Sequence, residues 1–140
     1  ADGTRVDVVV GPAMGAVTMA YELARALGVR GIFAERDSEQ SFTLRRGFEL
    51  QPGEKVLVAE DVVTTGGSVK ELLKLLESLG VEVVGVASLV NRSGGDRPFG
   101  DTAYYRLADL EIPSWDADAC ELCAAGAGEP VKPGSRPQAG

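Results

Sequence analysis

The chain has 140 residues, 44% of them hydrophobic and 25% charged, which is the composition of one globular domain with a buried core. Its formal net charge of -7 argues against general binding to nucleic acid, because that binding depends on clustered lysine and arginine. No apolar run approaches the roughly 18 residues of a membrane span, and no basic-plus-apolar secretory signal is found, so we expect a cytoplasmic protein that does not bind membranes. The sequence contains no histidine, which excludes His-dependent catalytic triads and His-based metal sites.

The first part of the chain is predicted to form one βαβ unit. The β-branched run Val6–Val10 predicts a core strand, and apolar residues at helical spacing then predict a helix that runs to about Leu27. Gly28 is the expected C-cap of this helix. A second strand is predicted at Val29–Ala34, and a unit of this kind is right-handed by strong preference.

Residues 35–53 do not continue the strand and helix pattern of the first βαβ unit. The polar segment that begins at Glu35 lacks helical or strand periodicity and predicts a mobile loop. Two short apolar segments follow, Phe42–Leu44 and Phe48–Leu50, and we expect them to form the arms of a loose hairpin around residues 45–47.

A second βαβ unit is predicted after residue 53. It consists of a strand at Lys55–Glu60, a helix at Gly67–Leu79 and a strand at Val81–Val90. Ser68 and Glu71 match a capping box at the start of the helix. The alternation of strands and helices predicts an open, mostly parallel, twisted α/β sheet with helices on both faces.

The last part of the chain is predicted to leave the core. An edge strand at Ala103–Leu107 completes a core domain at residues 1–112, and residues 113–125 are expected to form a helical extension with a Cys-x-x-Cys pair. Residues 126–140 are rich in glycine and proline and are expected to form a tail that is disordered or lies on the surface. The cysteine pair has only half the ligands of a zinc site, so we interpret it as two reduced thiols.

The most specific feature is the segment that follows the strand starting at Lys55. Two carboxylates, Glu60 and Asp61, end this strand, and a Thr/Gly/Ser loop at residues 64–68 precedes the next helix. Glycines let backbone N–H groups approach an anion, and a helix N-terminus adds partial positive charge. The loop lacks the lysine of a Walker A sequence, and no G-x-G-x-x-G occurs, so both nucleotide motifs are disfavoured.

Two acids beside an anion-binding loop indicate a sugar phosphate, whose hydroxyls need acceptors and whose phosphate needs donors. By itself the loop is explained equally well as an ordinary turn ahead of a helix. Because ligands of open α/β sheets collect at the carboxyl ends of the strands, we expect one crevice lined by the loops after Val10, Glu60 and Val90, together with the mobile segment after Ala34.

Residues 56–68 resemble the phosphoribosyl pyrophosphate (PRPP) signature of the type I phosphoribosyltransferases, which has two acids between hydrophobic pairs, then threonine, a small residue, glycine and a hydroxyl residue. Within that family the chain most resembles the orotate phosphoribosyltransferases, and the match covers nearly its whole length. This second resemblance rests on Gly11–Ala16, Phe33–Arg36, Leu44–Phe48, Val90–Gly95 and Cys120–Cys123. It implies a homodimeric enzyme of pyrimidine biosynthesis that transfers phosphoribosyl from PRPP to orotate, giving orotidine 5'-monophosphate and pyrophosphate.

The resemblance gives each loop a role. Residues 64–68 would hold the ribose 5-phosphate, and Glu60 and Asp61 would bind the ribose hydroxyls. The loop at residues 13–16 would face the pyrophosphate, and Mg²⁺ would be bound mainly through PRPP. Arg92 would pair with the orotate carboxylate, with a solvated loop arginine as the alternative.

The implied site residues fall into three groups. The catalytic residues are Glu60, Asp61 and Arg36. The orotate-binding residues are Thr64 and Arg92, and no metal-binding residue is implied. The PRPP-binding residues are Ala13, Met14, Gly15, Glu60, Asp61, Val62, Val63, Thr64, Thr65, Gly66, Gly67 and Ser68.

Three points stay open at the level of sequence. The lid segment at residues 37–43 lacks the lysines and histidine of many relatives, so the cation that neutralises pyrophosphate is not fixed, and Arg45 and Arg46 are nearly as well explained as surface residues. Nothing matches the family's N-terminal hood, and we expect the chain to lack that segment. Another purine or pyrimidine phosphoribosyltransferase and a non-catalytic PRPP-binding regulator are the alternative functions.

Overall fold

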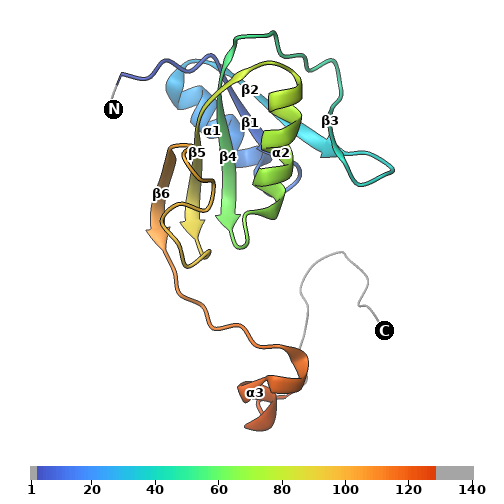
Figure 1. Ribbon diagram of the computed structural model, residues 1–140, viewed down its shortest axis with the longest axis vertical. Helices are drawn as coiled ribbons and strands as arrows, with labels where there is room; N and C mark the ends of the chain where they lie inside the picture. Colours follow the sequence, from blue (N-terminus) through green and yellow to red (C-terminus); the bar gives the residue numbers. More distant parts are fainter. Residues whose placement is uncertain (1–2, 129–140) are drawn as a thin grey trace.

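The computed structural model describes residues 3–128, which form an open sheet with a helix on each face and a C-terminal extension (Figure 1). The sheet has six strands in the order β3-β2-β1-β4-β5-β6. Along the chain the elements are β1 (Val8–Pro12), α1 (Val17–Leu27), β2 (Arg30–Arg36), β3 (Phe42–Leu44), β4 (Lys55–Val63), α2 (Gly67–Ser78), β5 (Glu82–Asn91), β6 (Tyr104–Asp109), a 3₁₀ turn (Ala117–Ala119) and α3 (Glu121–Ala124). All strand pairs are parallel except β2 with β3, so the predicted mostly parallel α/β sheet is confirmed.

The two central strands are buried on both faces. Val8, Val9 and Val10 of β1 have no exposed surface, and the Val56–Glu60 part of β4 is buried as well. Such continuous apolar runs are typical of parallel strands that are covered by helices on both sides. β4 pairs with β1 on one side and with β5 on the other, which makes it a central strand of the sheet.

Helices α1 and α2 cover opposite faces of the sheet. Ala20 and Ala24 of α1 pack with Val9 in one hydrophobic cluster. Leu72 and Leu76 of α2 belong to the other cluster, on the opposite face. The alternation of side chains along β1 explains this division, because successive residues of a strand point to opposite faces. The prediction of helices on both faces is therefore confirmed.

Strand β4 is longer than predicted. It does not end at Glu60 but continues to Val63, because its last residues pair with the last residues of β5, Val62 with Val90 and Val63 with Asn91. The two acids consequently lie within the strand near its carboxyl end, where the backbone holds them in fixed positions.

The predicted capping box at the start of α2 is wrong. The N-cap is Gly66, with φ of 75°, and no side chain caps this terminus in the described part of the chain. Ser68 lies inside the first turn, and Glu71 forms an ion pair of 2.7 Å with Arg36 instead. The helix begins at Gly67, as predicted, but its N-cap is a glycine in the left-handed conformation, two residues before the serine of the proposed capping box.

The predicted hairpin between Phe42–Leu44 and Phe48–Leu50 is also wrong, because these two segments do not pair with each other. Phe42–Leu44 pairs antiparallel with the end of β2, as strand β3, and Phe48–Leu50 is not a strand. The connecting turn is fixed by Asp37, whose Oδ1 accepts hydrogen bonds from the backbone N–H groups of Glu39 at 2.9 Å and Ser41 at 3.0 Å. An Asp that accepts from nearby backbone groups stabilises a tight turn, and this turn brings β3 back to the open edge of β2.

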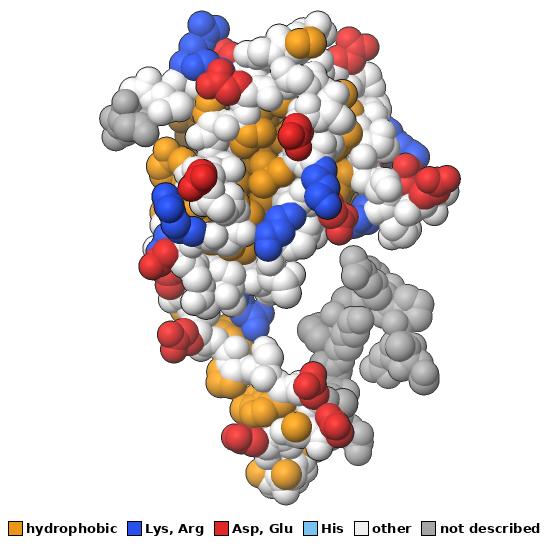
Figure 2. All heavy atoms as spheres, viewed as in Figure 1, with side chains coloured by type: hydrophobic (Ala, Val, Ile, Leu, Met, Phe, Trp, Pro, Cys, Tyr) orange, Lys and Arg blue, Asp and Glu red, His pale blue; other side chains and the backbone are white. Residues whose placement is uncertain are grey.

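The segment after β6 leads away from the sheet to the short helix α3 (Figure 1). Its hydrophobic side chains at Ile112, Trp115 and Leu122 are exposed, and Figure 2 shows hydrophobic side chains on the surface of this extension. The predicted division into residues 1–112 and 113–125 stays a prediction, and most of the predicted tail lies outside the described residues. No helix within residues 3–128 has the length and apolar character of a membrane span.

Leu72→Ala tests the importance of the α2 face of the core. Leu72 is fully buried, so its truncation removes apolar contacts and leaves a cavity, and we expect the free energy of unfolding to fall by about 3 kcal/mol. Urea denaturation followed by far-UV circular dichroism measures this change. Leu27→Ala is the matched control, because Leu27 is 47% exposed and its truncation should cost less than about 1 kcal/mol. Equal losses in the two variants would contradict the packing described here.

Candidate active site

The loops that follow β1, β4 and β5 meet at the carboxyl edge of the sheet. Gly15, in the loop after β1, lies directly against the carboxylate of Asp61 in β4: a Cβ added to Gly15 would be 2.9 Å from Asp61 Oδ2. The backbone N–H of Arg92, in the loop after β5, donates to the carbonyl of Val63 at 2.7 Å. The loops after β1 and β5 therefore each contact the end of β4. The cavities there are separate, one lined by Gly15 and Asp61 and another by Glu60 and residues 62–69, and the predicted single crevice stays a prediction.

The loop after β1 contributes mainly backbone atoms, and few side-chain atoms, to this edge of the sheet. The peptide bond between Ala13 and Met14 is cis, and the N–H of Ala13 donates to the carbonyl of Ala34 in β2 at 2.8 Å. Met14 points outward with 80% of its surface exposed, whereas Ala16 is buried at the start of α1. A glycine at position 15 leaves room for the Asp61 carboxylate, because a Cβ there would force that carboxylate to shift.

Glu60 is a buried acid next to a second acid. Its side chain is 8% exposed, and its Oε1 accepts a hydrogen bond from the backbone N–H of Asp61 at 3.2 Å. Burial, together with the neighbouring carboxyl of Asp61, raises the pKa of Glu60 to about 8. Asp61 is less buried, and its Oδ1 accepts from the backbone N–H of Val62 at 2.8 Å. A buried acid with a raised pKa in a crevice is characteristic of a functional site.

The loop between β4 and α2 forms a small cradle. The cavity has a volume of about 60 Å³ and is lined by Glu60 and by residues 62–69. Gly66 lies at the base of the loop against the ring of Phe99, and a Cβ at this glycine would be 3.0 Å from the Phe99 ring. The N-terminal end of the 12-residue helix α2 faces this cavity without a side-chain cap, in the part of the chain that the structure describes. Uncapped N–H groups at a helix start bind anions.

Arg92 follows β5 directly and is only partly exposed. Its Nε is buried and has no hydrogen-bond partner in the structure. A buried donor without a partner is costly, so this nitrogen is a candidate donor for an acceptor that the described residues do not supply. Thr64 lies on the exposed side of the neighbouring loop after β4.

Arg36 is held away from the acid pair. Its guanidinium forms the ion pair with Glu71 of α2, lies 4.3 Å from the centre of the Phe42 ring and donates to the carbonyl of Gln40. Among the described residues, no hydrogen bond or ion pair joins Arg36 to Glu60 or Asp61. The predicted catalytic role of Arg36 therefore stays a prediction.

The two arginines of the following turn differ from each other. Arg46 forms two hydrogen bonds with the carboxylate of Glu35, at 2.8 and 2.9 Å, and these hydrogen bonds lower the pKa of Glu35. Arg45 is exposed. Arg46 is exposed and its guanidinium is paired with Glu35, which favours the surface role that the sequence left open for it.

Sequence reasoning missed two features of the site. One is the contact between Gly15 and Asp61, which joins segments 46 residues apart and has no local signal. The other is Asn91, a buried polar residue directly before Arg92. Its signal in the sequence was a single amide that ends the long apolar run of β5. No group of three or more metal-binding side chains is found in residues 3–128.

Glu60→Gln tests whether the pKa of the buried Glu60 carboxyl is raised. A carboxyl whose pKa rises from 4.5 to about 8 on folding stabilises the fold while it is protonated and loses that stabilisation as the pH rises from about 4.5 to about 8. Glutamine does not titrate, so Glu60→Gln removes this dependence of the unfolding free energy on pH. Relative to the unchanged chain, the variant should gain about 3 kcal/mol of unfolding free energy between about pH 5 and about pH 8, measured by urea denaturation. The exposed Glu39→Gln is the control, and an equal difference at both pH values would contradict the raised pKa.

Comparisons with known proteins identify the family of this chain. The family model described as phosphoribosyl transferase domain matches residues 1–119. Orotate phosphoribosyltransferase from Caldanaerobacter subterraneus subsp. tengcongensis is 52% identical over 134 residues, which are 96% of this chain and 69% of that relative. The same enzyme from Acidithiobacillus ferrooxidans is 51% identical over 132 residues, 94% of this chain and 67% of the relative.

A solved structure supports the same grouping. The crystal structure of Mycobacterium tuberculosis H37Rv orotate phosphoribosyltransferase in complex with inorganic phosphate is similar with a TM-score of 0.61 and 27% identity, over 76% of this chain and 61% of that one. The fold, the acid pair beside an anion cradle and the identity over most of the chain lead to one conclusion: the chain belongs to the phosphoribosyltransferase family, and within it to the orotate phosphoribosyltransferases.

Proposed function

We propose that this chain carries the reaction centre that transfers a phosphoribosyl group from PRPP to orotate, giving orotidine 5'-monophosphate and pyrophosphate. The observation that carries the proposal is the meeting of Glu60, Asp61 and Gly15 beside the cradle after β4. Family membership points to the same reaction, since the relatives are named orotate phosphoribosyltransferases.

The cradle and the acid pair supply the two kinds of contact that a ribose phosphate needs. Backbone N–H groups at the start of α2, with the hydroxyls of Thr65 and Ser68, would donate to the 5-phosphate. The carboxylates of Glu60 and Asp61 would accept from the ribose hydroxyls. As pyrophosphate leaves, positive charge develops on the sugar, and two neighbouring carboxylates stabilise it electrostatically.

The reaction breaks the bond between the anomeric carbon and pyrophosphate and forms a bond from that carbon to a ring nitrogen of the base. A base that binds as an anion needs no proton abstraction, which suits a chain without histidine. The loop at residues 13–16, beside Asp61, would present its backbone N–H groups to the leaving pyrophosphate.

Mg²⁺ is part of the proposal and would be bound mainly through PRPP. The carboxylate oxygens of Glu60 and Asp61 are hard ligands of the kind that Mg²⁺ prefers, so the residues at the site fit this ion. With few protein ligands the ion would keep waters and substrate oxygens, and it would supply neutralisation of the pyrophosphate charge. The homodimer and the cytoplasmic location expected from the sequence also stay proposals.

Arg92 is proposed to recognise the orotate carboxylate, and Thr64 to contact the base beside it. The unpartnered Nε of Arg92 supports this role, because a planar guanidinium pairs with a carboxylate through two parallel hydrogen bonds. Uracil and hypoxanthine have no carboxylate, so this contact would distinguish orotate from them.

Replacing both acids tests the proposed chemistry. We expect Glu60→Gln with Asp61→Asn to lower kcat/KM with orotate and PRPP by on the order of 10³-fold, because both negative charges beside the sugar are lost. A steady-state assay of orotidine monophosphate formation on the full chain measures this. The matched control, Glu77→Gln with Asp101→Asn, also removes two negative charges but only at exposed positions, and should leave turnover within about twofold. Unchanged turnover in the acid variant would overturn the roles of both residues.

Arg92→Ala tests the choice of base. We expect KM for orotate to rise by on the order of 100-fold, with KM for PRPP changed by less than about threefold, because a charged hydrogen-bond pair to the base is lost. Arg97→Ala, at an exposed arginine of the same loop region, is the control. Turnover of uracil or hypoxanthine in place of orotate by the unchanged chain would support another phosphoribosyltransferase activity. If the unchanged chain binds PRPP but converts none of these bases, the result would support a non-catalytic PRPP-binding regulator.

A further inference from the structure

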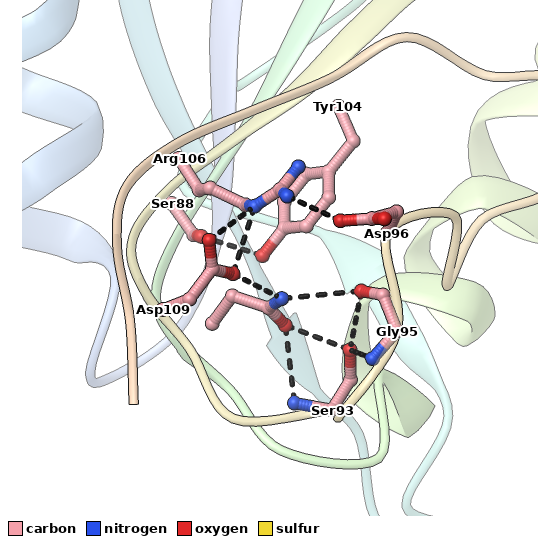
Figure 3. A network of polar contacts seen from close by, with 8 residues as sticks. Ser88, Ser93, Gly95, Asp96, Tyr104, Arg106 and Asp109 are labelled. Carbon is pink, nitrogen blue, oxygen red and sulfur yellow. Dashed lines mark hydrogen bonds and ion pairs between the residues drawn. The ribbon is translucent and has the colours of Figure 1, made fainter. Parts of the chain in front are cut away.

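The side chain of Asn91 organises the loop that carries Arg92. Its Oδ1 accepts hydrogen bonds from the backbone N–H of Ser93 at 3.0 Å and from the Ser93 hydroxyl at 2.7 Å. Its Nδ2 donates to the carbonyl of Gly95 at 3.2 Å and to Asp109 Oδ1 at 2.7 Å. Figure 3 shows Ser93, Gly95 and Asp109 together at this point of the fold. Both acceptor positions and both donor positions of one amide are therefore in use, and the residue is only 4% exposed.

The same network ties the loop to strand β6. Asp109 accepts from Arg106 Nε with both oxygens, at 2.8 and 3.0 Å, and Arg106 also forms an ion pair of 2.6 Å with Asp96 at the far end of the loop (Figure 3). The hydrogen bond from Asn91, followed by that from Arg106, lowers the pKa of Asp109. Asn91 thus donates to an ionised acceptor, which makes this hydrogen bond stronger than one between neutral groups.

Arg92 lies between the residues that this network holds. Its backbone is fixed to β4 by the hydrogen bond to the Val63 carbonyl, and its neighbours in sequence are held by the Asn91 side chain. Its own guanidinium takes no part in the network. No ion pair joins it to a carboxylate anywhere in residues 3–128, whereas Arg36, Arg46 and Arg106 each have a carboxylate partner. Arg97, the other arginine of this loop region, lies 3.8 Å from the carboxylate of Asp101. The loop is anchored, and the guanidinium of Arg92 is left for a ligand.

We propose that Asn91 is a positioning residue for the acceptor base: acting through Arg92, it sets the direction in which the guanidinium meets the base carboxylate. The inference rests on the proposed function, in which Arg92 pairs with orotate. It extends the proposal to specificity, because an arginine on an unanchored loop would lose the geometry of a two-hydrogen-bond contact.

An amide is required at this position for a reason of chemistry. Aspartate would keep both acceptor contacts to Ser93 but would donate to neither Gly95 nor Asp109, and its charge would lie beside the Asp109 carboxylate. Alanine would lose all four contacts. Only a side chain with two donors and two acceptors at one site, asparagine or the longer glutamine, satisfies the whole set.

The kinetic test compares Asn91→Asp with the unchanged chain, using orotate and PRPP as varied substrates. We expect KM for orotate to rise about tenfold, while KM for PRPP changes less than about twofold. In an Arg92→Ala background, Asn91→Asp should have little further effect on KM for orotate, because its action passes through Arg92. Ser88→Ala is the control: it removes a partly buried hydrogen bond of 2.7 Å to Tyr104 between the same two strands, outside the loop, and should not change KM for orotate selectively.

A paired substitution and a spectroscopic signal complete the test. Exchanging the groups, Asn91→Asp with Asp109→Asn, restores one hydrogen bond without the charge repulsion and should recover part of the lost orotate affinity. Asn91 is the only asparagine in the sequence, so selective ¹⁵N-asparagine labelling gives one side-chain amide signal for it. We expect slow exchange of both amide protons with water, and a shift of the signal when orotate binds.

The outcomes separate the inference from the function on which it rests. If the unchanged chain converts orotate but Asn91→Asp leaves KM for orotate the same, or lowers binding of orotate and PRPP equally, the inference is overturned and the function stands. If the unchanged chain neither binds nor converts orotate, both are overturned. Should Asn91→Asp fail to fold, Asn91→Ala takes its place, with the same expected difference between the two KM values.

Discussion

The pairing of β4 with both β1 and β5 determines where the chemistry of this protein lies. Because the strand is central and buried, its last residues bring Glu60 and Asp61 to a fixed place at the carboxyl edge of the sheet. The neighbouring strands end at the same edge, so the loops that follow them begin beside the end of β4. Gly15 allows the loop after β1 to approach Asp61 closely, and the Val63 carbonyl holds the backbone of the loop after β5.

Much of the fold could be predicted because its signals are local and strong. The apolar runs of β1 and β4, the periodic apolar faces of the two helices and the glycine after α1 each lie within one short segment. The errors arose where a non-local contact decides the structure. Phe42–Leu44 pairs with the open edge of β2 instead of with Phe48–Leu50, and Glu71 pairs with Arg36 instead of capping its helix. Neither partner can be identified from the residues next to it.

In the candidate site, too, local features could be predicted from the sequence and non-local contacts could not. The signature at residues 56–68 located the acids and the cradle from sequence, because these groups are consecutive in the chain. The structure adds what brings distant segments together, such as the contact of Gly15 with Asp61 and the hydrogen bonds of the Asn91 amide to the loop after β5 and to Asp109 of β6. The catalytic role of Arg36 was implied by the family resemblance of Phe33–Arg36 and stays a prediction, and its ion pair with Glu71 has no local signal in the sequence.

Burial of Glu60 links ligand binding to protons. Near neutral pH this carboxyl is mostly protonated in the free protein, since its pKa is about 8. A ligand whose hydroxyls need the ionised carboxylate has to expel that proton when it binds, so its affinity falls as the pH falls below about 8. The heat of binding then includes the ionisation of whichever buffer accepts the proton. The negative charge of Glu60 would be created by the ligand that uses it.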